Sequence, residues 1–194
     1  MQVKKEEIRQ TIIDVATNEF MRMGYENVSM RVIAYKANTT IGNIYHYFKN
    51  KEVLLQTILI PVFDNIENLM KQHFENEIKC PLTQKEALYY AEHLEEFFDK
   101  SELRGFLDKR IVIILKLESS SLLERKEKFI EELQEHLQQH IRMKDDAHYS
   151  KIVIDVLADC LKHVLIEHDN INDAKAEFIK LFRLFCTGFI GQMK

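Results

Sequence analysis

Two pairs of residues in this sequence have the types and the spacing that chemistry on a helix would need. His136 and His140 are four residues apart, which can place two imidazoles on one helix face for a metal ion. Neither an HExxH motif nor a third ligand at useful spacing accompanies them, so we predict no metal site. Asp159 and His163 share the spacing and are typical of a pair that stabilises a helix.

Motifs for catalysis are absent from the sequence. It contains no GxSxG, P-loop, Rossmann or Cys–His signature. Its three cysteines, Cys80, Cys160 and Cys186, stand far apart, which indicates neither a zinc ribbon nor a disulfide framework. We therefore predict no catalytic residue, no enzymatic activity and no cofactor.

The sequence predicts a cytoplasmic protein that does not bind a membrane. Its first residues, MQVKKEEIRQ, lack the apolar run of a signal peptide. The longest apolar cluster, over 103–117, contains charged residues and is shorter than the ~18 apolar residues that a membrane span needs. A buried helix explains this cluster better.

The secondary structure of the chain is predicted to consist of about nine helices. Apolar residues recur at spacings of three and four along almost every stretch, which indicates amphipathic helices. Five Gly and two Pro in 194 residues leave few turns for a sandwich or barrel. We expect an all-α fold, with helices over 84–99, 106–118, 122–142, 147–168 and 173–191 after the first four.

The first 50 residues have the dimensions of a helix-turn-helix unit. Gly24 is placed to end the first helix, and Ser29 to cap a short second one. Asn38 tolerates the left-handed backbone of a tight turn, and Thr40 can cap a third helix. We predict a helix-turn-helix domain over 1–50 and a larger helical domain over 51–194.

The fourth helix is expected to start at Lys51 and to reach about Ile78, with Pro61 inside it. Proline removes one backbone donor and should kink a helix. Two interpretations stay open: Pro61 marks a hinge, or it marks a fixed kink.

Charge is distributed unevenly along the chain. The net charge is −4, but residues 1–51 hold eight Lys and Arg against five Asp and Glu. A basic N-terminal segment followed by an acidic remainder is expected when only one end of a protein binds a polyanion.

The sequence GYENVSMRVIAYKANTTIGNIYHYFKNKEVLL, over 24–55, resembles the DNA-binding end of the tetracycline-repressor (TetR) family of bacterial regulators. The run Gly42-x-Ile44-Tyr45-His46-Tyr47-Phe48 followed by Lys51-Glu52-x-Leu54-Leu55 carries most of the resemblance. Two positions depart from the family pattern. Asn38 stands where Gly is frequent, and Ile41 stands where a basic residue commonly follows the cap.

The resemblance implies that the third helix enters the major groove of DNA with its N-terminal residues at base edges. It assigns Gly42, Asn43 and His46 to bases, and Tyr45 and Tyr47 to bases or phosphate. Ser29, Thr40 and Lys51 suit phosphate through their hydroxyl groups and charge. Ile44 and Phe48 should pack the small core.

For the larger domain the family implies a homodimer and a cavity for a small-molecule effector. The predicted dimerisation residues lie on the last two helices: Val153, Val156, Leu157, Leu161, Phe178, Phe182, Phe185 and Phe189. The candidate walls of the cavity are apolar or aromatic: Phe63, Met70, Phe74, Tyr89, Phe97, Phe106, Ile113 and Leu117. Their character favours an apolar or aromatic effector, although such stripes also form plain core.

The function predicted is a ligand-responsive transcriptional regulator, a repressor that an effector releases from a palindromic double-stranded DNA operator. The alternative is a helical ligand-binding or partner-binding module that has lost DNA binding. Ile41 and the modest positive charge of the N-terminal segment favour that alternative.

Overall fold

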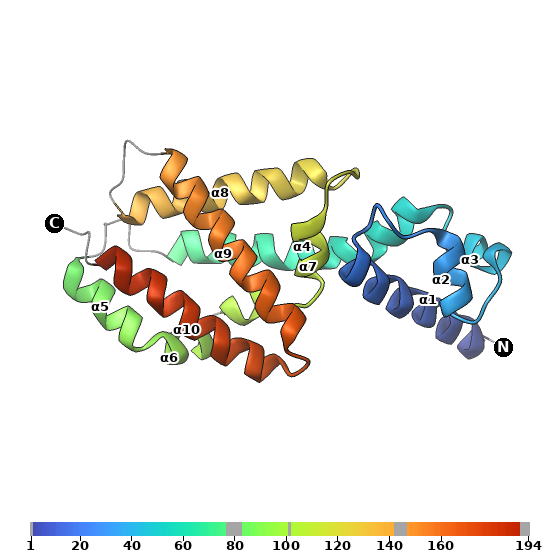
Figure 1. Cartoon of the computed structure of the whole chain (residues 1–194), viewed down its shortest axis with the longest axis horizontal. Helices are drawn as coiled ribbons and strands as arrows, with labels where there is room; N and C mark the ends of the chain where they lie inside the picture. The colour runs from blue at the N-terminus through green and yellow to red at the C-terminus, as the bar shows by residue number, and fades with distance from the viewer. Residues whose placement is uncertain (1, 77–82, 101, 142–146, 191–194) are drawn as a thin grey trace. The chain divides into compact units, whose positions relative to one another are not determined.

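The computed structural model describes residues 2–76, 83–100, 102–141 and 147–190. These residues form ten α-helices and one short 3-10 helix, η1, with no strand among them (Figure 1). The all-α fold with an N-terminal helix-turn-helix is confirmed. The helices are α1 (Gln2–Met23), α2 (Met30–Lys36), α3 (Ile41–Tyr47), α4 (Lys51–Asn76), α5 (Gln84–Glu92), α6 (Leu94–Lys100), η1 (Glu102–Leu107), α7 (Ile111–Lys116), α8 (Leu123–Ile141), α9 (Ala147–Glu167) and α10 (Ile171–Ile190).

The helix ends predicted from polar residues and glycine are confirmed. Gly24 (φ 80°) and Asn38 (φ 50°) both adopt the left-handed backbone after a helix. The Ser29 hydroxyl accepts from the Val32 N–H at 3.3 Å, and the Thr40 hydroxyl accepts from the Asn43 N–H at 3.1 Å. These short side chains fix where α2 and α3 begin.

Two predicted helices are wrong in extent. The helix expected over 84–99 is divided into α5 and α6, with His93 as the C-cap between them and no Gly or Pro to signal the break. The helix expected over 106–118 shrinks to α7, because Glu102–Leu107 forms η1 instead. A Cβ on Gly105 would lie 2.3 Å from Leu69 Cδ1, so η1 packs tightly against α4 there. Tertiary packing therefore overrides the local apolar pattern.

The chain divides into two compact units that are not continuous in sequence. The first comprises Met1–Asp64 and Lys109–Lys126, and the second comprises Asn65–Asp108 and Glu127–Lys194. The first unit thus contains α7 and the first residues of α8 in addition to the helix-turn-helix. Both α4 and α8 begin in the first unit and end in the second. The functional division at residue 50 stays a prediction.

The core of the first unit consists of buried side chains from five helices: α1, α2, α3, the first part of α4, and α7. Its fully buried members include Ile12, Phe20, Ile33, Ile44, Phe48, Leu54, Leu55, Ile58, Leu59 and Ile113. Lys51–Gln72 of α4 is long and apolar enough to cross a membrane, but 44% of its most apolar window is buried inside the protein. This stretch therefore has the character of a core helix.

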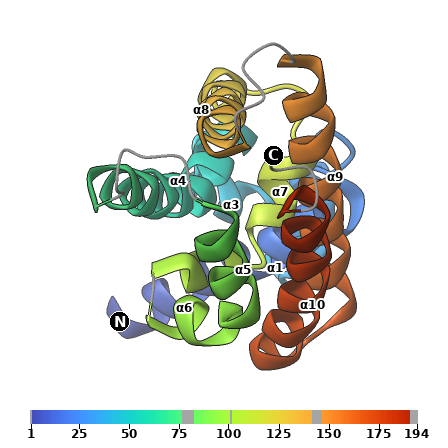
Figure 2. The same cartoon turned by 90° about the vertical axis from the view of Figure 1, so that its left-hand side faces the viewer.

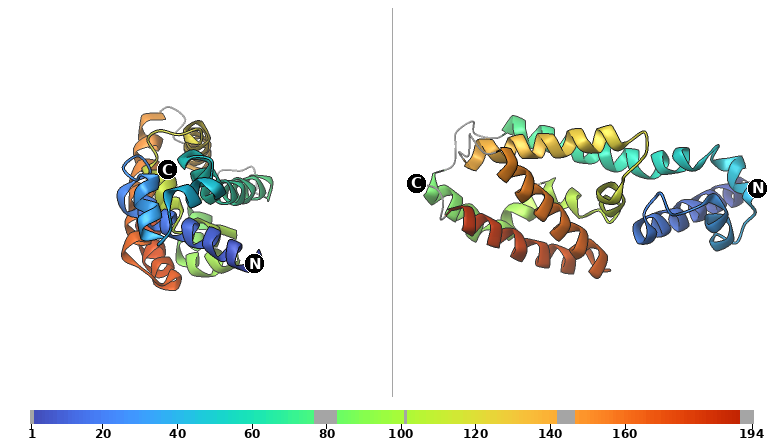
Figure 3. Two further views of the ribbon diagram at one scale, coloured as in Figure 1. Left: turned by 90° about the vertical axis from the view of Figure 1, so that its right-hand side faces the viewer. Right: turned by 45° about the horizontal axis from the view of Figure 1, so that its top comes forward.

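In the second unit, α10 packs against α5 and α9 (Figure 2). The helices α9 and α10 also run side by side in a different view (Figure 3). Arg183 Nε donates to the Ala91 carbonyl at 3.1 Å and ties α10 to α5. Asp159 forms an ion pair with Lys162, and the predicted partner His163 adds a smaller electrostatic effect that also lowers the pKa of Asp159. Lysine at i+3 reaches this carboxylate from the same helix face.

Candidate nucleic-acid interface

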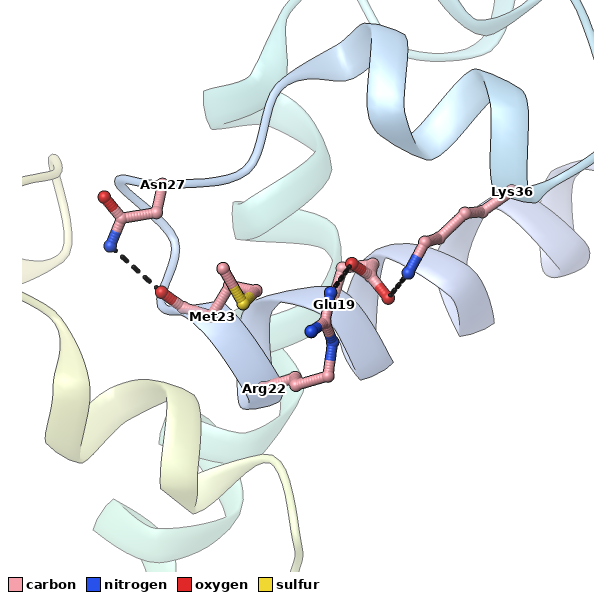
Figure 4. A network of polar contacts seen from close by, with 5 residues as sticks. All are labelled: Glu19, Arg22, Met23, Asn27 and Lys36. Atoms are coloured by element: carbon pink, nitrogen blue, oxygen red, sulfur yellow. Dashed lines mark hydrogen bonds and ion pairs between the residues drawn. The ribbon is translucent and has the colours of Figure 1, made fainter.

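A buried carboxylate joins α1 to α2 in the helix-turn-helix. Glu19 is 6% exposed, and its two oxygens accept from Arg22 at 2.9 Å and from Lys36 at 2.5 Å (Figure 4). Beside them, Asn27 Nδ2 donates to the Met23 carbonyl at 3.0 Å, which closes the end of α1. The hydrogen bonds from Arg22 and Lys36 hold the pKa of Glu19 below its usual value. This network fixes the angle at which α2 leaves α1.

Replacing Glu19 by glutamine should destabilise the protein by about 1–3 kcal/mol at pH 7, because two charged donors lose a charged acceptor. A carboxylate whose pKa is lowered by folding stabilises the folded state above its unfolded pKa, about 4.3, and loses this effect as pH falls through the folded value. The difference in the free energy of unfolding between wild type and Glu19→Gln should therefore be smaller at acid pH. Urea unfolding at pH 7 and at pH 4 measures it.

Glu7→Gln is the matched control, because Glu7 is an exposed glutamate on the same helix. It should unfold as the wild type does at both pH values. If the difference in the free energy of unfolding between wild type and Glu19→Gln is the same at both pH values, the assigned ion pairs are wrong.

The third helix turns its apolar side inward and its polar and aromatic side outward. Ile44 is fully buried and Phe48 is 1% exposed, as predicted. Tyr45 is 52% exposed, and Gly42 and His46 are also exposed. A Cβ added to Gly42 would meet no atom within 4 Å, so this face is open at the start of α3. The open face suits close approach of another molecule.

The remaining predicted DNA-binding residues have partners that position them. The Ser29 and Thr40 hydroxyls are exposed helix caps, while Asn43 and Tyr47 are half-buried on α3. The His46 and Tyr47 rings pack edge to face with centroids 5.4 Å apart. The structure thus brings seven of the eight predicted residues, from Ser29 to Tyr47, onto α2, α3 and their caps.

The prediction for Lys51 needs correction. Its ammonium group donates to the carbonyls of Tyr25 and Val28 at 2.9 and 3.0 Å and to that of Glu26 at 3.4 Å. It also lies 4.2 Å from the centre of the Tyr25 ring. An ammonium has three donors, so these carbonyls use its full capacity. Lys51 is therefore suited to bracing the loop before α2 rather than to holding phosphate.

Two further carboxylates hold the turn between α7 and α8 against this loop and the start of α4. Glu26 Oε1 accepts from the N–H groups of Glu118 and Ser119 at 3.0 and 2.8 Å. Glu52 Oε1 accepts from the Ser121 N–H at 3.0 Å and from its hydroxyl at 2.5 Å. We call these contacts the carboxylate clasp.

The carboxylate clasp changes the ionisation of its members. Burial raises the pKa of Glu26 and Glu52, but hydrogen bonds outweigh it, and both pKa values lie below the ordinary one. The donors are the Glu26 N–H and residues 118 and 119 for Glu26, and Ser121 and Tyr25 for Glu52. The Tyr25 hydroxyl donates to Glu52 Oε2 at 2.8 Å, and burial together with this bond raises the pKa of Tyr25. Both carboxylates are thus ionised at neutral pH and occupied by internal donors.

The sequence reasoning overlooked three residues of this interface. Arg31 and Tyr35 are exposed on α2, Tyr35 to 86%, and Lys49 is exposed after α3. Arg31 and Tyr35 are four residues apart, on the side of α2 away from the buried Ile33 and Ala34. That periodicity was a usable signal.

Arg31 and Lys49, not Lys51, are expected to set the salt dependence of DNA binding. Each phosphate contact that is removed should flatten the slope of log affinity against log salt by about 0.9. We expect this change for Arg31→Ala and for Lys49→Ala, measured by fluorescence anisotropy over a series of KCl concentrations. Lys51→Met should leave the slope unchanged and lower the stability by about 1–3 kcal/mol, because three carbonyls lose a charged donor. A flatter slope for Lys51→Met would contradict the bracing role.

The helix-turn-helix segment matches a known family of proteins. Residues 12–58 match the sequence model of the bacterial regulatory proteins of the tetR family. Over these residues, about a quarter of its length, the chain is similar to the tetR family. The match covers α2, α3 and the adjoining parts of α1 and α4, which are the elements that carry the open face.

Two curated proteins that the chain resembles are regulators by name. The fatty acid metabolism regulator protein of Bacillus subtilis is 35% identical over 113 residues, which are 57% of this chain and 53% of that protein. The HTH-type transcriptional repressor KstR of Rhodococcus jostii is 34% identical over 64 residues, 33% of this chain and 30% of that protein. The chain thus matches about half of these relatives' length or less.

A solved structure shows the same fold over a longer span. The crystal structure of a gamma-butyrolactone receptor (ArpA-like protein) covers 98% of both chains with a TM-score of 0.51 at 18% identity. This likeness concerns the fold alone.

The dimerisation face predicted from the sequence differs in part from the apolar surface that the structure exposes. Val153 and Leu161 are 6% and 9% exposed and belong to the core of the second unit, which corrects their assignment. Leu157, Phe178, Phe182 and Phe185 are half-buried, and the Phe189 side chain lies outside the described residues. The exposed apolar side chains include Ile152, Val156, Ile166 and Leu184. Neighbouring helix positions differ by about 100°, so a shift of one residue changes the face.

The predicted effector wall is divided between the two units. Phe63, Ile113 and Leu117 are buried in the first, and Met70 is buried in the second. Phe106 is half-buried and stacks on Phe129 with centroids 6.3 Å apart, whereas Tyr89 is 53% exposed on α5. The side chains of Phe74 and Phe97 lie outside the described residues.

A groove of about 410 Å³ lies elsewhere in the first unit. Its lining is mainly polar and consists of Gln10, Ile13, Asp14, Thr17, Asn18 and Arg110. None of the predicted wall residues lines it, so the effector wall stays a prediction.

Proposed function

We propose that the chain is a cytoplasmic, homodimeric transcriptional regulator that binds a palindromic DNA operator and is released by a small apolar molecule. The observation that carries the proposal is the open face of α3, where Gly42, Tyr45 and His46 are exposed while Ile44 anchors the helix. A short helix anchored on one side and polar on the other suits the major groove.

Electrostatics supports the same reading. Glu19, Glu26 and Glu52 are all engaged by internal donors, so their charges are partly compensated within the helix-turn-helix unit. Arg31 and Lys49 remain at the surface on the elements that flank α3. A polyanion approaching α3 therefore meets exposed cations and compensated anions.

Two relatives support the regulatory outcome and the class of effector. KstR is named a transcriptional repressor, which favours repression for this chain. The relative named for fatty acid metabolism favours an effector with a hydrocarbon chain. That chemistry agrees with the buried aromatic and aliphatic residues of both units. Palmitate is a suitable first probe, and its binding should weaken the operator complex.

The deciding experiment selects binding sites from random duplex DNA with the purified protein. We expect a palindromic motif with wild type and none with Tyr45→Ala/His46→Ala, whose folding is checked by circular dichroism. If the folded wild type selects no sequence at low salt, before and after denaturation and refolding to remove bound ligand, the DNA-binding function is wrong. The chain would then be a ligand-binding or partner-binding module.

In the proposed mechanism, α4 transmits the effector signal and Pro61 is its hinge. Pro61 has no N–H, so the Thr57 carbonyl cannot receive the helical bond from residue 61. The Thr57 hydroxyl also donates to the Val53 carbonyl at 2.8 Å, a contact that often bends helices. Both features weaken α4 within a few residues of the boundary between the two compact units.

Replacing Pro61 by alanine should restore a regular helix and reduce the loss of operator affinity that the effector causes. Operator titrations with and without palmitate measure this loss. If both the affinity and its loss on effector binding match the wild type, Pro61 is a fixed kink.

A further inference from the structure

The side chain of Asn43 is held by a residue outside its own helix. Asn43 Nδ2 donates to the Thr39 hydroxyl oxygen at 2.8 Å, and both side chains are half-buried. Thr39 precedes Thr40, the N-cap of α3, and therefore lies in the turn rather than in the helix. The amide of Asn43 is thus oriented from the turn between α2 and α3.

The position of Thr39 is itself fixed by the end of α2. The Thr39 N–H donates to the Ala34 carbonyl at 3.0 Å, and the Asn38 N–H donates to the Tyr35 carbonyl at 3.2 Å. With Asn38 at φ 50°, this pair of bonds is a Schellman motif, which locks the backbone after a helix. The hydroxyl that meets Asn43 is consequently placed by α2, and the Thr40 hydroxyl holds the Asn43 N–H at 3.1 Å.

This arrangement leaves a defined part of the amide available. An asparagine amide carries two N–H donors and one carbonyl acceptor, and Thr39 takes one donor. One donor and the carbonyl oxygen remain, which is the pair that matches the N6 and N7 edge of adenine. A side chain already held in its binding orientation loses less conformational entropy on binding.

We propose that Thr39 is a positioning residue for base reading, whose hydroxyl orients the Asn43 amide toward one base pair of the operator. The proposal rests on the proposed DNA-binding function. Through Asn43, Thr39 then influences which base the protein prefers at one position of each operator half-site.

The test compares binding-site selections for wild type, Asn43→Ala, Thr39→Val and Thr39→Ser, with thermal unfolding of each protein as a check on folding. Valine has the shape of threonine without the hydroxyl, and serine keeps the hydroxyl. We expect Asn43→Ala and Thr39→Val to lose preference at the same base pair by about five- to tenfold, a loss within the range of one good base contact. Thr39→Ser should keep the wild-type preference, and Thr39→Ala replaces Thr39→Val if the valine variant unfolds.

The outcomes separate this proposal from the function on which it rests. A wild-type protein that selects no motif contradicts the DNA-binding function. If wild type selects a motif and Thr39→Val selects it with the same base preferences, or binds every site uniformly more weakly, the positioning role is wrong. It is also wrong if Asn43→Ala leaves the preferences unchanged.

Discussion

Replacing Gly42 by alanine is expected to weaken operator binding about tenfold, a cost of ~1.4 kcal/mol, while the protein stays folded. The added methyl group meets no protein atom within 4 Å, so the structure accommodates it without strain. Alanine is also the better helix former by at most about 1 kcal/mol, so the unfolding midpoint should stay constant or rise by a few degrees. Binding and stability should therefore move in opposite directions.

The measurement pairs fluorescence anisotropy on the selected operator with thermal unfolding. Gly42→Glu should weaken binding further, because it brings a carboxylate to the phosphate backbone. Glu131→Ala, at an exposed position of α8, is the matched control and should bind as the wild type does. An alanine at position 42 that binds with wild-type affinity would show that the start of α3 does not approach DNA closely.

A charge at Leu184 is expected to convert the proposed homodimer into monomers. Leu184 on α10 is a large apolar residue that is 69% exposed. A dimer interface that buries it would have to bury the unpaired carboxylate of Leu184→Glu, which is strongly unfavourable. Losing one of two linked half-site contacts should lower operator affinity by about 100-fold or more.

Analytical ultracentrifugation measures the oligomeric state, and operator titration measures the affinity. Met23→Glu is the matched control, because Met23 is 46% exposed in the other compact unit and should leave the dimer intact. If Leu184→Glu remains dimeric, the interface lies on a different face. Val156→Glu tests α9 in the same way, since Val156 is 43% exposed.

The sequence predicts those features of the structure that depend on interactions between residues close together in the chain. The caps Ser29 and Thr40 and the left-handed Asn38 were predictable, because each acts on backbone groups two to four residues away. The open face of α3 was predictable for the same reason. Its residues follow the helical period around Ile44.

Contacts between distant segments were not predictable from one sequence. Lys51 looked like a phosphate ligand because it is a cation next to the motif, yet it faces three carbonyls some 25 residues earlier in the chain. The assignment of Val153 and Leu161 to a partner surface failed because periodicity identifies an apolar face without saying what covers it. The shape of η1 depends likewise on its packing against α4 at Gly105.

The discontinuous make-up of the first compact unit has a consequence for synthesis on the ribosome. When Asp64 has been made, the nascent chain already has α1, α2 and α3 but lacks α7 and the serines that complete the carboxylate clasp. At roughly 5–20 residues per second, about 3–12 s pass before Lys126 is added. During that time Glu26 and Glu52 have no partners from residues 118–121. The first compact unit therefore becomes complete only after residues 65–108, the first segment of the second unit, have been translated.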